Sequence, residues 1–266
     1  MSDLTSFYVS SSAFPCFSDA VAYCKKHSLN LEISFFARGY EYDMTSQQEF
    51  EDCKKMFDAV PEMQKILHGI CFDIVPTSLD PQVIELTRQR MKQSIELARY
   101  FNAHTVIFHS GYNSNVKYES YKNQFIINQS EYWKSFLDDN NITDLTVALE
   151  NTYEETPRIL KEICDMVNSP YFKTCIDTGH VNAFTNYNLI HWISELKNHL
   201  HHFHIHNNTS NTDFHDSLIN GSIDYIDFFD YVLTLDVPLS YTLEMFDEQY
   251  VTDSLLFINN NYSGVL

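Results

Sequence analysis

Eight short apolar runs, separated by longer stretches with helical patterning, extend along the whole chain and constrain its fold more than any other feature. Such alternation of strand-length and helix-length segments is typical of repeated βα units around a parallel sheet. The expected strands are residues 7–10, 31–36, 66–72, 105–109, 145–150, 173–177, 202–206 and 239–244.

The clearest helix among the intervening stretches is the segment from Asp80 to Phe101. Asp80 can cap this helix, Pro81 suits its first turn, and apolar residues recur along its length. No linker rich in Pro, Gly or Ser divides the chain. We therefore predict an α/β fold, a single (β/α)8 TIM barrel domain spanning residues 1–266, which is a usual size for such barrels.

The charge balance and the cysteines limit the partners of the chain. It has 17 Lys and Arg against 36 Asp and Glu, a formal charge of −19, which repels a polyanion. Its six cysteines show no CxxC spacing, which indicates reduced thiols and a cytoplasmic location. Without a signal peptide or a membrane-length apolar run, we expect no membrane partner. A small-molecule substrate is expected and a nucleic acid is not, while nothing in the sequence specifies the oligomeric state.

Polar residues lie at or near the ends of the apolar runs. In a TIM barrel the carboxyl ends of the strands carry the reacting groups. The polar residues are His68, His109, Glu150, Asp177, His204, His206 and Glu244. A single histidine in such a place usually fills a polar notch, but buried carboxylates in this number need a cation or partners. We therefore predict a metal centre at this rim. Because His204 and His206 are two residues apart, alternation allows either of them to be the ligand.

A further pair of polar residues flanks Phe214 in the segment after the seventh strand. Asp213 and His215 would commonly form a surface turn, but near His180 they could complete another metal site. Carboxylates mixed with imidazoles suit Zn²⁺ or Mn²⁺.

The motifs VALENT, CIDTGH, HFHIHNN, DFHDSLINGSID and YTLEMF resemble, in this order, the strand-end motifs of the xylose-isomerase-like barrel superfamily. This superfamily includes sugar phosphate isomerases and epimerases as well as endonuclease IV-like nucleases. LHGICFDIVPTSLD followed by VIFHSGY also resembles the bacterial sugar phosphate isomerases and epimerases. The resemblance spans nearly the whole chain.

The resemblance implies two groups of metal ligands. The set that would hold one divalent ion is Glu150, Asp177, His204 and Glu244. The further ligands of a cluster of up to three ions would be His68, His109, His180, Asp213 and His215, with Glu150 bridging two ions.

Three functions remain open on these residues. The first is a metal-dependent isomerase or epimerase of a small sugar, sugar phosphate or related keto or polyol compound, in which Glu150 and Glu244 remove and return a proton next to a carbonyl. The alternative is an endonuclease IV-like multinuclear zinc phosphodiesterase that cleaves DNA at abasic sites. A barrel with another metal-based chemistry, or one that only binds a ligand, is the third.

The negative charge favours the first function, as does the acidic segment 37–52 where a nuclease would need phosphate contacts. Arg38 and Lys117 lie in loops expected to face the site, and either could hold a substrate phosphate. The loops from Arg38 to Met44 and from Asn113 to Tyr121 are expected to set specificity.

Overall fold

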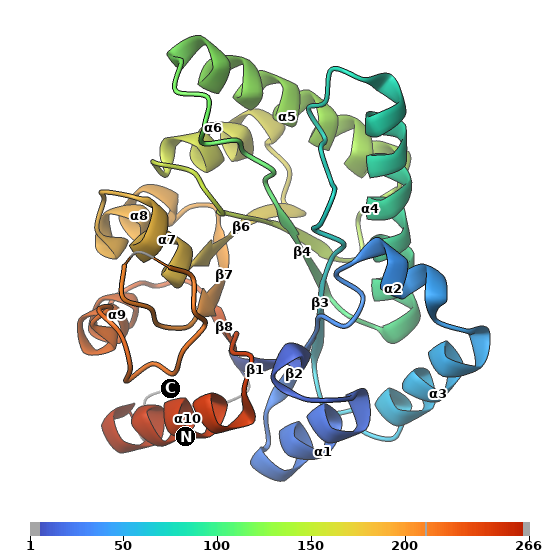
Figure 1. Cartoon of the computed structure of the whole chain (residues 1–266), viewed down its shortest axis with the longest axis vertical. Coiled ribbons are helices and arrows are strands. Elements are labelled where there is room, and N and C mark those ends of the chain that lie inside the picture. Colours follow the sequence, from blue (N-terminus) through green and yellow to red (C-terminus); the bar gives the residue numbers. More distant parts are fainter. Residues whose placement is uncertain (1–5, 211, 263–266) are drawn as a thin grey trace.

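Eight parallel strands pair in chain order, and β1 closes against β8 to form a barrel. The computed structural model describes residues 6–210 and 212–262. Figure 1 shows the helices arranged around the strands. The strands are β1 (Phe7–Ser10), β2 (Asn30–Ile33), β3 (Lys65–His68), β4 (Thr105–His109), β5 (Thr146–Glu150), β6 (Phe172–Asp177), β7 (Leu200–Ile205) and β8 (Ser240–Leu243). The predicted (β/α)8 barrel is confirmed.

The helices follow the strands along the chain, and most of them pack against the outside of the barrel (Figure 1). They are α1 (Phe17–His27), α2 (Gly39–Met44), α3 (Gln47–Asp58), α4 (Pro81–Phe101), α5 (Glu119–Asp139), α6 (Arg158–Val167), α7 (Thr178–Phe184), α8 (Leu189–Leu196), α9 (Tyr225–Val232) and α10 (Glu248–Tyr262), with a short 3-10 turn, η2 (Ser11–Ala13). Helix α4 confirms the predicted helix, and the Asp80 carboxylate caps it by accepting a hydrogen bond from the Gln82 amide at 2.8 Å. None of the helices in the described part of the chain is long and apolar enough to span a membrane.

The second strand is shorter than predicted, since it ends at Ile33 and not at Phe36. The Ser34 side chain turns toward β1 and hydrogen bonds with the Ser10 hydroxyl at 2.9 Å. Phe35 and Phe36 instead pack against Phe17 on α1, with ring centroids 4.3 and 5.5 Å apart. The apolar run therefore continues beyond the strand because these rings bury themselves under a helix.

The third strand is also shorter, ending at His68 and not at residue 72. Beyond Gly69 the backbone leaves the ladder, because the Ile70 amide donates to the Ser94 hydroxyl at 3.0 Å and the Cys71 amide donates to the Ala37 carbonyl at 3.0 Å. A second correction concerns residues 39–44, which were expected in a loop and form helix α2.

The barrel interior is layered. Side chains from five strands form an apolar layer in the interior of the barrel: Tyr8, Ile66, Ile107, Ala148 and Cys175. Side chains on one face of a strand recur every two residues. Two residues further along four of these strands stand His68, His109, Glu150 and Asp177. The polar groups thus form the next layer, at the carboxyl ends of the strands, where a TIM barrel places its active site.

Candidate metal centre

A cavity of about 600 Å³ opens at the carboxyl ends of the strands. Seven of the nine predicted ligands line it, namely His68, His109, Glu150, His180, Asp213, His215 and Glu244. The other two, Asp177 and His204, are fully buried beside these residues. All nine predicted positions are therefore brought together at one end of the barrel.

The central group consists of four residues from four strand ends. Glu150 ends β5, Asp177 ends β6, His204 lies in β7, and Glu244 directly follows β8. One donor atom from each lies within 4.8 Å of the donor atoms of the other three. The Nδ1 atom of His204 lies 3.3 Å from Oε1 of Glu150 and 3.1 Å from Oε2 of Glu244. This spacing is compatible with ligands converging on one cation.

The His204 ring is oriented by a residue that the sequence reasoning missed. Glu32 of β2 is fully buried, and its Oε2 lies 3.1 Å from Nε2 of His204. This contact places a proton on Nε2, which donates to Glu32, so Nδ1 is the nitrogen that faces Glu150 and Glu244 and would bind a metal once it gave up its proton. A carboxylate inside an otherwise apolar strand was the signal that could have identified Glu32.

Two further imidazoles lie beside the other carboxylate oxygen of Glu150, the one that does not face His204. This oxygen, Oε2, is 3.6 Å from Nε2 of His68 and 3.5 Å from Nε2 of His109. The Nδ1 of His68 lies 3.0 Å from the Gly69 carbonyl oxygen, to which it can donate. The Nε2 lone pair of His68 is then directed toward Glu150, so Glu150 has groups able to share a cation on both of its oxygens.

His180, Asp213 and His215 form a third group with donor atoms within 4.8 Å of one another. Both imidazole Nε2 atoms face Oδ2 of Asp213, at 3.1 and 3.2 Å. Their Nδ1 atoms lie 2.8 Å from the Asn151 carbonyl and 2.7 Å from the Glu244 carbonyl, respectively. Backbone acceptors on Nδ1 fix the tautomer in which Nε2 can bind a metal.

His206 directly follows β7, two residues after His204, but its imidazole reaches another carboxylate. Its Nε2 lies 3.1 and 3.2 Å from the two oxygens of Asp177, and its ring stacks on His215 with centroids 3.8 Å apart. A Cβ at position 179 would come within 1.9 Å of the His206 ring, so the close approach requires Gly179. His206 thus sits between the central group and the third group.

Asp177 also has a structural task. Its Oδ1 accepts a hydrogen bond from the His180 amide at 2.6 Å and so caps α7. The Asn151 side chain clamps the Asp177 backbone, accepting from its amide at 2.9 Å and donating to its carbonyl at 3.1 Å. The short helix therefore starts at the rim and carries His180 into the site.

The electrostatics of the cluster reflect the close packing of opposite charges. Burial works against the charged form of Glu244, but the neighbouring His204 outweighs it and holds the pKa of Glu244 below its ordinary value. The pKa of His204 is raised well above its ordinary value, against the effect of burial, by surrounding acidic groups that include Glu244 and Glu150. Burial lowers the pKa of His109 to about 4, so this imidazole is neutral near pH 7. Protonated histidines therefore balance carboxylates that a cation would balance once it displaced those protons.

The buried polar atoms test whether a metal fits here. Among the described residues, several buried side-chain atoms at this site have no hydrogen-bonding partner: both carboxylate oxygens of Glu150, Oε2 of Glu244, Nδ1 of His204 and Oδ1 of Asp213. Unpartnered buried groups are costly, and few are found in folded proteins. Their concentration at one site, in a set of oxygen and nitrogen donors, fits a divalent cation such as Zn²⁺ or Mn²⁺.

Of the two basic side chains expected to hold a substrate phosphate, one lies at the cavity and the other does not. Arg38 lines the cavity, with its guanidinium 5.2 Å from the centroid of the Phe72 ring and 2.9 Å from Glu41. Lys117 is not among the described residues that line the cavity, and its ammonium pairs with Glu155 at 2.6 Å. Arg38 is therefore the candidate for contact with a substrate.

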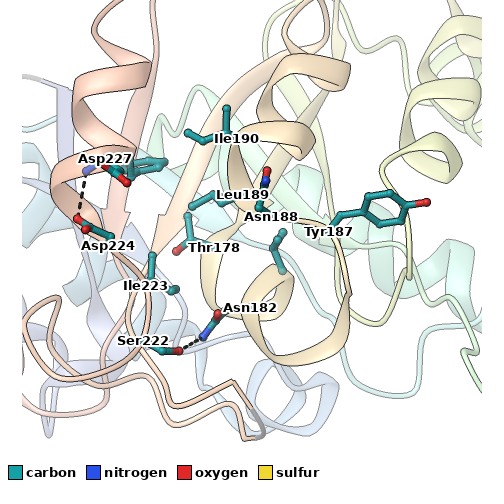
Figure 2. A pocket seen from close by; sticks show the side chains of 12 residues that line it. Thr178, Asn182, Tyr187, Asn188, Leu189, Ile190, Ser222, Ile223, Asp224 and Asp227 are labelled. Carbon is teal, nitrogen blue, oxygen red and sulfur yellow. Dashed lines mark hydrogen bonds between the residues drawn. The ribbon is translucent and has the colours of Figure 1, made fainter.

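A smaller pocket of about 230 Å³ lies outside the barrel mouth, between α7, α8 and α9 (Figure 2). The Asn182 amide and the Ser222 hydroxyl hydrogen bond across it at 2.9 Å. Asp224 caps α9 there by accepting from the Asp227 amide at 3.1 Å. None of the nine predicted ligands is among the described residues lining this pocket, and the candidate site is the larger cavity.

Comparisons with known proteins agree with this architecture. The sequence model of a protein family described as a xylose isomerase-like TIM barrel matches residues 21–261. An uncharacterized protein of Methanocaldococcus jannaschii is 25% identical over 175 residues, which are 62% of this chain and 59% of that protein. The match thus spans less than two thirds of the length of this relative.

Solved structures share the fold. A D-tagatose 3-epimerase-like protein superposes with a TM-score of 0.81 at 21% identity, covering 98% of each chain. A protein from Thermus thermophilus that was soaked with zinc chloride superposes with a TM-score of 0.76 at 16% identity. The superposition covers 97% of this chain and 98% of that one.

Proposed function

The chain belongs to the xylose isomerase-like TIM barrel family, and on that premise we propose that it is a divalent-metal-dependent isomerase or epimerase. Its substrate would be a small sugar, a sugar phosphate or a related keto or polyol compound. The similarity of its fold to a D-tagatose 3-epimerase-like protein supports this substrate class. Six unpaired cysteines support a reducing compartment, the cytoplasm, as its location.

The observation that carries the proposal is the convergence of Glu150, Asp177, His204 and Glu244 at the floor of the cavity. These residues would hold the catalytic cation, Zn²⁺ or Mn²⁺. When bound, it would polarise a substrate carbonyl and an adjacent hydroxyl and so acidify the neighbouring C–H bond. The use of zinc chloride with a protein of the same fold supports Zn²⁺ as one of the candidate cations.

Glu150 and Glu244 are the proposed acid–base pair. They reach the cavity from β5 and β8, which are three strands apart, so one carboxylate can remove a proton from one face of a substrate carbon while the other returns it to the opposite face. Burial raises the pKa of both carboxyls, but the neighbouring His204 outweighs it and holds both pKa values below their ordinary range; when bound, the cation would supply this positive charge in place of the proton on His204. The volume of about 600 Å³ lies within the range of small-molecule sites.

The alternative function, a multinuclear zinc phosphodiesterase, is favoured by one observation. His180, Asp213 and His215 form a complete second set of ligands whose tautomers are fixed by backbone carbonyls. The charge of the site argues against a nucleic acid, because Arg38 is the one Arg or Lys among the described residues lining the cavity and the chain carries a net charge of −19.

Exchange of substrate hydrogen with solvent tests the proposal. Purified protein loaded with Mn²⁺ or Zn²⁺ is incubated in deuterated water with a panel of keto-sugars and their phosphates, and in parallel with duplex DNA containing an abasic site. We expect deuterium to enter a sugar C–H position without incision of the DNA. Exchange should fall by about 10²- to 10⁴-fold in Glu150→Gln and Glu244→Gln, the usual loss when a general base is removed.

The buried Glu154 provides the control for these variants. It follows the same strand as Glu150 but is not among the described residues that line the cavity, so Glu154→Gln should keep its exchange activity. Metal content is measured in every variant, which separates loss of a base from loss of a ligand. Incision that disappears in His109→Ala and Asp213→Ala, with no exchange on any sugar, would establish the alternative function.

A further inference from the structure

Cys71 lies at the cavity wall, three residues after the end of β3, and the proposed isomerase chemistry does not use it. Its thiol is one of three donor groups, with the imidazoles of His68 and His109, whose donor atoms all lie within 4.8 Å of one another. We propose that the Cys71 thiolate is a ligand of a second divalent cation, bound together with His68, His109 and Glu150. The family resemblance implies the two histidines and Glu150 for this position but not a cysteine.

The carboxylate of Glu150 independently indicates a ligand at this position. Glu150 is 1% exposed, and its Oε2 has no hydrogen-bonding partner among the described residues. That oxygen lies 3.6 Å from Nε2 of His68 and 3.5 Å from Nε2 of His109. The two imidazoles and the thiolate supply three of the four donors of a tetrahedral zinc site. The Glu150 carboxylate lies beside both imidazoles but outside that group of three, and it would supply the fourth donor.

The backbone holds Cys71 in place on both sides. The Gly69 amide donates to the Ile107 carbonyl of β4 at 2.8 Å, and the Cys71 amide donates to the Ala37 carbonyl at 3.0 Å. The segment that carries the thiol is therefore tied to β4 and to the segment between β2 and α2. The thiol also contacts the Ala37 carbonyl oxygen, at 3.7 Å, a contact that it would give up on losing its proton to bind a cation.

A thiolate changes which cation this position prefers. Soft sulfur ligands select Zn²⁺ and its thiophilic analogues Co²⁺ and Cd²⁺, whereas Mn²⁺ and Mg²⁺ prefer oxygen. The central group of Glu150, Asp177, His204 and Glu244 contains three carboxylates and no sulfur, so it accepts Mn²⁺ more readily. The two positions therefore differ in metal preference, with Zn²⁺ at the Cys71 position and either ion at the central position.

This inference rests on the proposed function only for the metal-binding role of Glu150, and cobalt spectroscopy tests it separately. Protein stripped by a chelator is titrated with Co²⁺, and the near-ultraviolet absorption of thiolate-to-cobalt charge transfer is followed. We expect this band in the wild type, no band in Cys71→Ser, and an unchanged band in Cys175→Ala. Cys175 is the matched control, because it lies inside the barrel on β6, the strand that Asp177 ends, and is the other thiol near the cluster.

Alkylation of the wild-type protein gives a second readout that needs no variant. Iodoacetamide modification is followed by peptide mass, with the exposed Cys16 as the internal reference. We expect Zn²⁺ to slow modification of Cys71, because the free thiolate is the species that is alkylated, and to leave Cys16 unaffected. Mn²⁺ at a concentration that fills the central group should leave Cys71 reactive.

The outcomes separate the two claims. A charge-transfer band that persists in Cys71→Ser, binding of two Co²⁺ ions without a band, or alkylation of Cys71 at the same rate with Zn²⁺ would each overturn the inference. The same protein samples are assayed for deuterium exchange into sugars. A thiolate band without exchange would contradict the proposed function alone, and exchange without the band would contradict this inference alone.

Discussion

The Oε2 atom of Glu32 lies 3.1 Å from the Nε2 atom of His204, although the two residues are 172 positions apart in the chain. Both side chains are fully buried at the centre of the barrel. The other nitrogen of His204, Nδ1, faces Glu150 and Glu244. Glu32 therefore orients the imidazole so that Nδ1 faces the other members of the central group, to which Glu32 itself does not belong.

We expect Glu32→Ala to weaken Zn²⁺ binding by about 10- to 100-fold, the usual effect of removing a hydrogen-bonding partner of a ligating histidine. The effect of Glu32→Gln should be smaller, because the amide oxygen can still accept the proton on Nε2. Competition with a chromophoric chelator measures both affinities. An unchanged affinity in folded Glu32→Ala would show that the ring needs no such support.

Gly179 gives a prediction about packing beside the site. A Cβ at this position would lie 1.9 to 2.6 Å from atoms of the His206 ring, so Gly179→Ala must displace that ring. We expect a loss of about 1 to 3 kcal/mol in the free energy of unfolding, as for other overpacked sites, measured by urea denaturation. Gly39→Ala is the control, because its Cβ would meet only the flexible Arg90 side chain, at 3.0 Å. Equal stabilities of the two variants would contradict the observed contact.

Glu154 gives a prediction about pH. Burial raises the pKa of this carboxyl from 4.5 to about 6, and its hydrogen bonds from Ser110 and the Thr152 amide offset only part of this effect. The folded protein therefore holds this proton more tightly than the unfolded chain does. The proton on Glu154 therefore adds about 2 kcal/mol to the free energy of unfolding. This contribution is complete below about pH 4.5 and is lost as the pH rises through 6.

Glu154→Gln lacks this titration, so its stability relative to the wild type should rise between about pH 4 and pH 7, as measured by urea unfolding at intervals across that window. Glu155→Gln is the neighbouring control, because hydrogen bonds from Lys117 and Lys122 lower the pKa of Glu155 and give the opposite trend. A constant difference between Glu154→Gln and the wild type at all pH values would refute the assignment.

Arg38 is expected to distinguish phosphorylated from unphosphorylated substrates. Its guanidinium lies at the cavity wall over Phe72, where it can contact a phosphate. Arg38→Ala should raise KM for a sugar phosphate by roughly 10- to 100-fold, the worth of a hydrogen bond to a charged group, and leave the free sugar unaffected. Lys117→Ala should change neither, and equal losses on both substrates in Arg38→Ala would exclude a phosphate-binding role.

The order of strands and the place of the polar residues followed from the sequence because both depend on local pattern. Strands β1 and β4 end where their apolar runs end, and Glu150 and Asp177 directly follow such runs. Strand β2 was predicted too long because residues buried under helices are as apolar as residues in a strand. Phe36 is one of these residues, packed against Phe17 and not in the sheet. Strand β3 was predicted too long because Cys71 and Phe72, apolar in sequence, line the cavity instead of continuing the sheet.

The details of the site depended on contacts between distant residues and could not be read from pattern alone. His204 and His206 are two residues apart at the carboxyl end of β7, and the positions of Glu32 and Asp177 distinguish their surroundings. The closeness of Cys71 to the histidines depends on how the chain leaves β3 toward the Ala37 carbonyl, which no periodicity records. These long-range contacts fix which nitrogen and which thiol face the cavity.

Anomalous X-ray diffraction tests the central claim most directly, because it locates a bound metal without reference to activity. Crystals grown with Zn²⁺ or Mn²⁺ are measured on both sides of the absorption edge of each metal. We expect a peak about 2.0 to 2.3 Å from donor atoms of Glu150, Asp177, His204 and Glu244. No peak among these four residues, or one bound only by other residues, would contradict the assignment of the metal and with it the proposed chemistry.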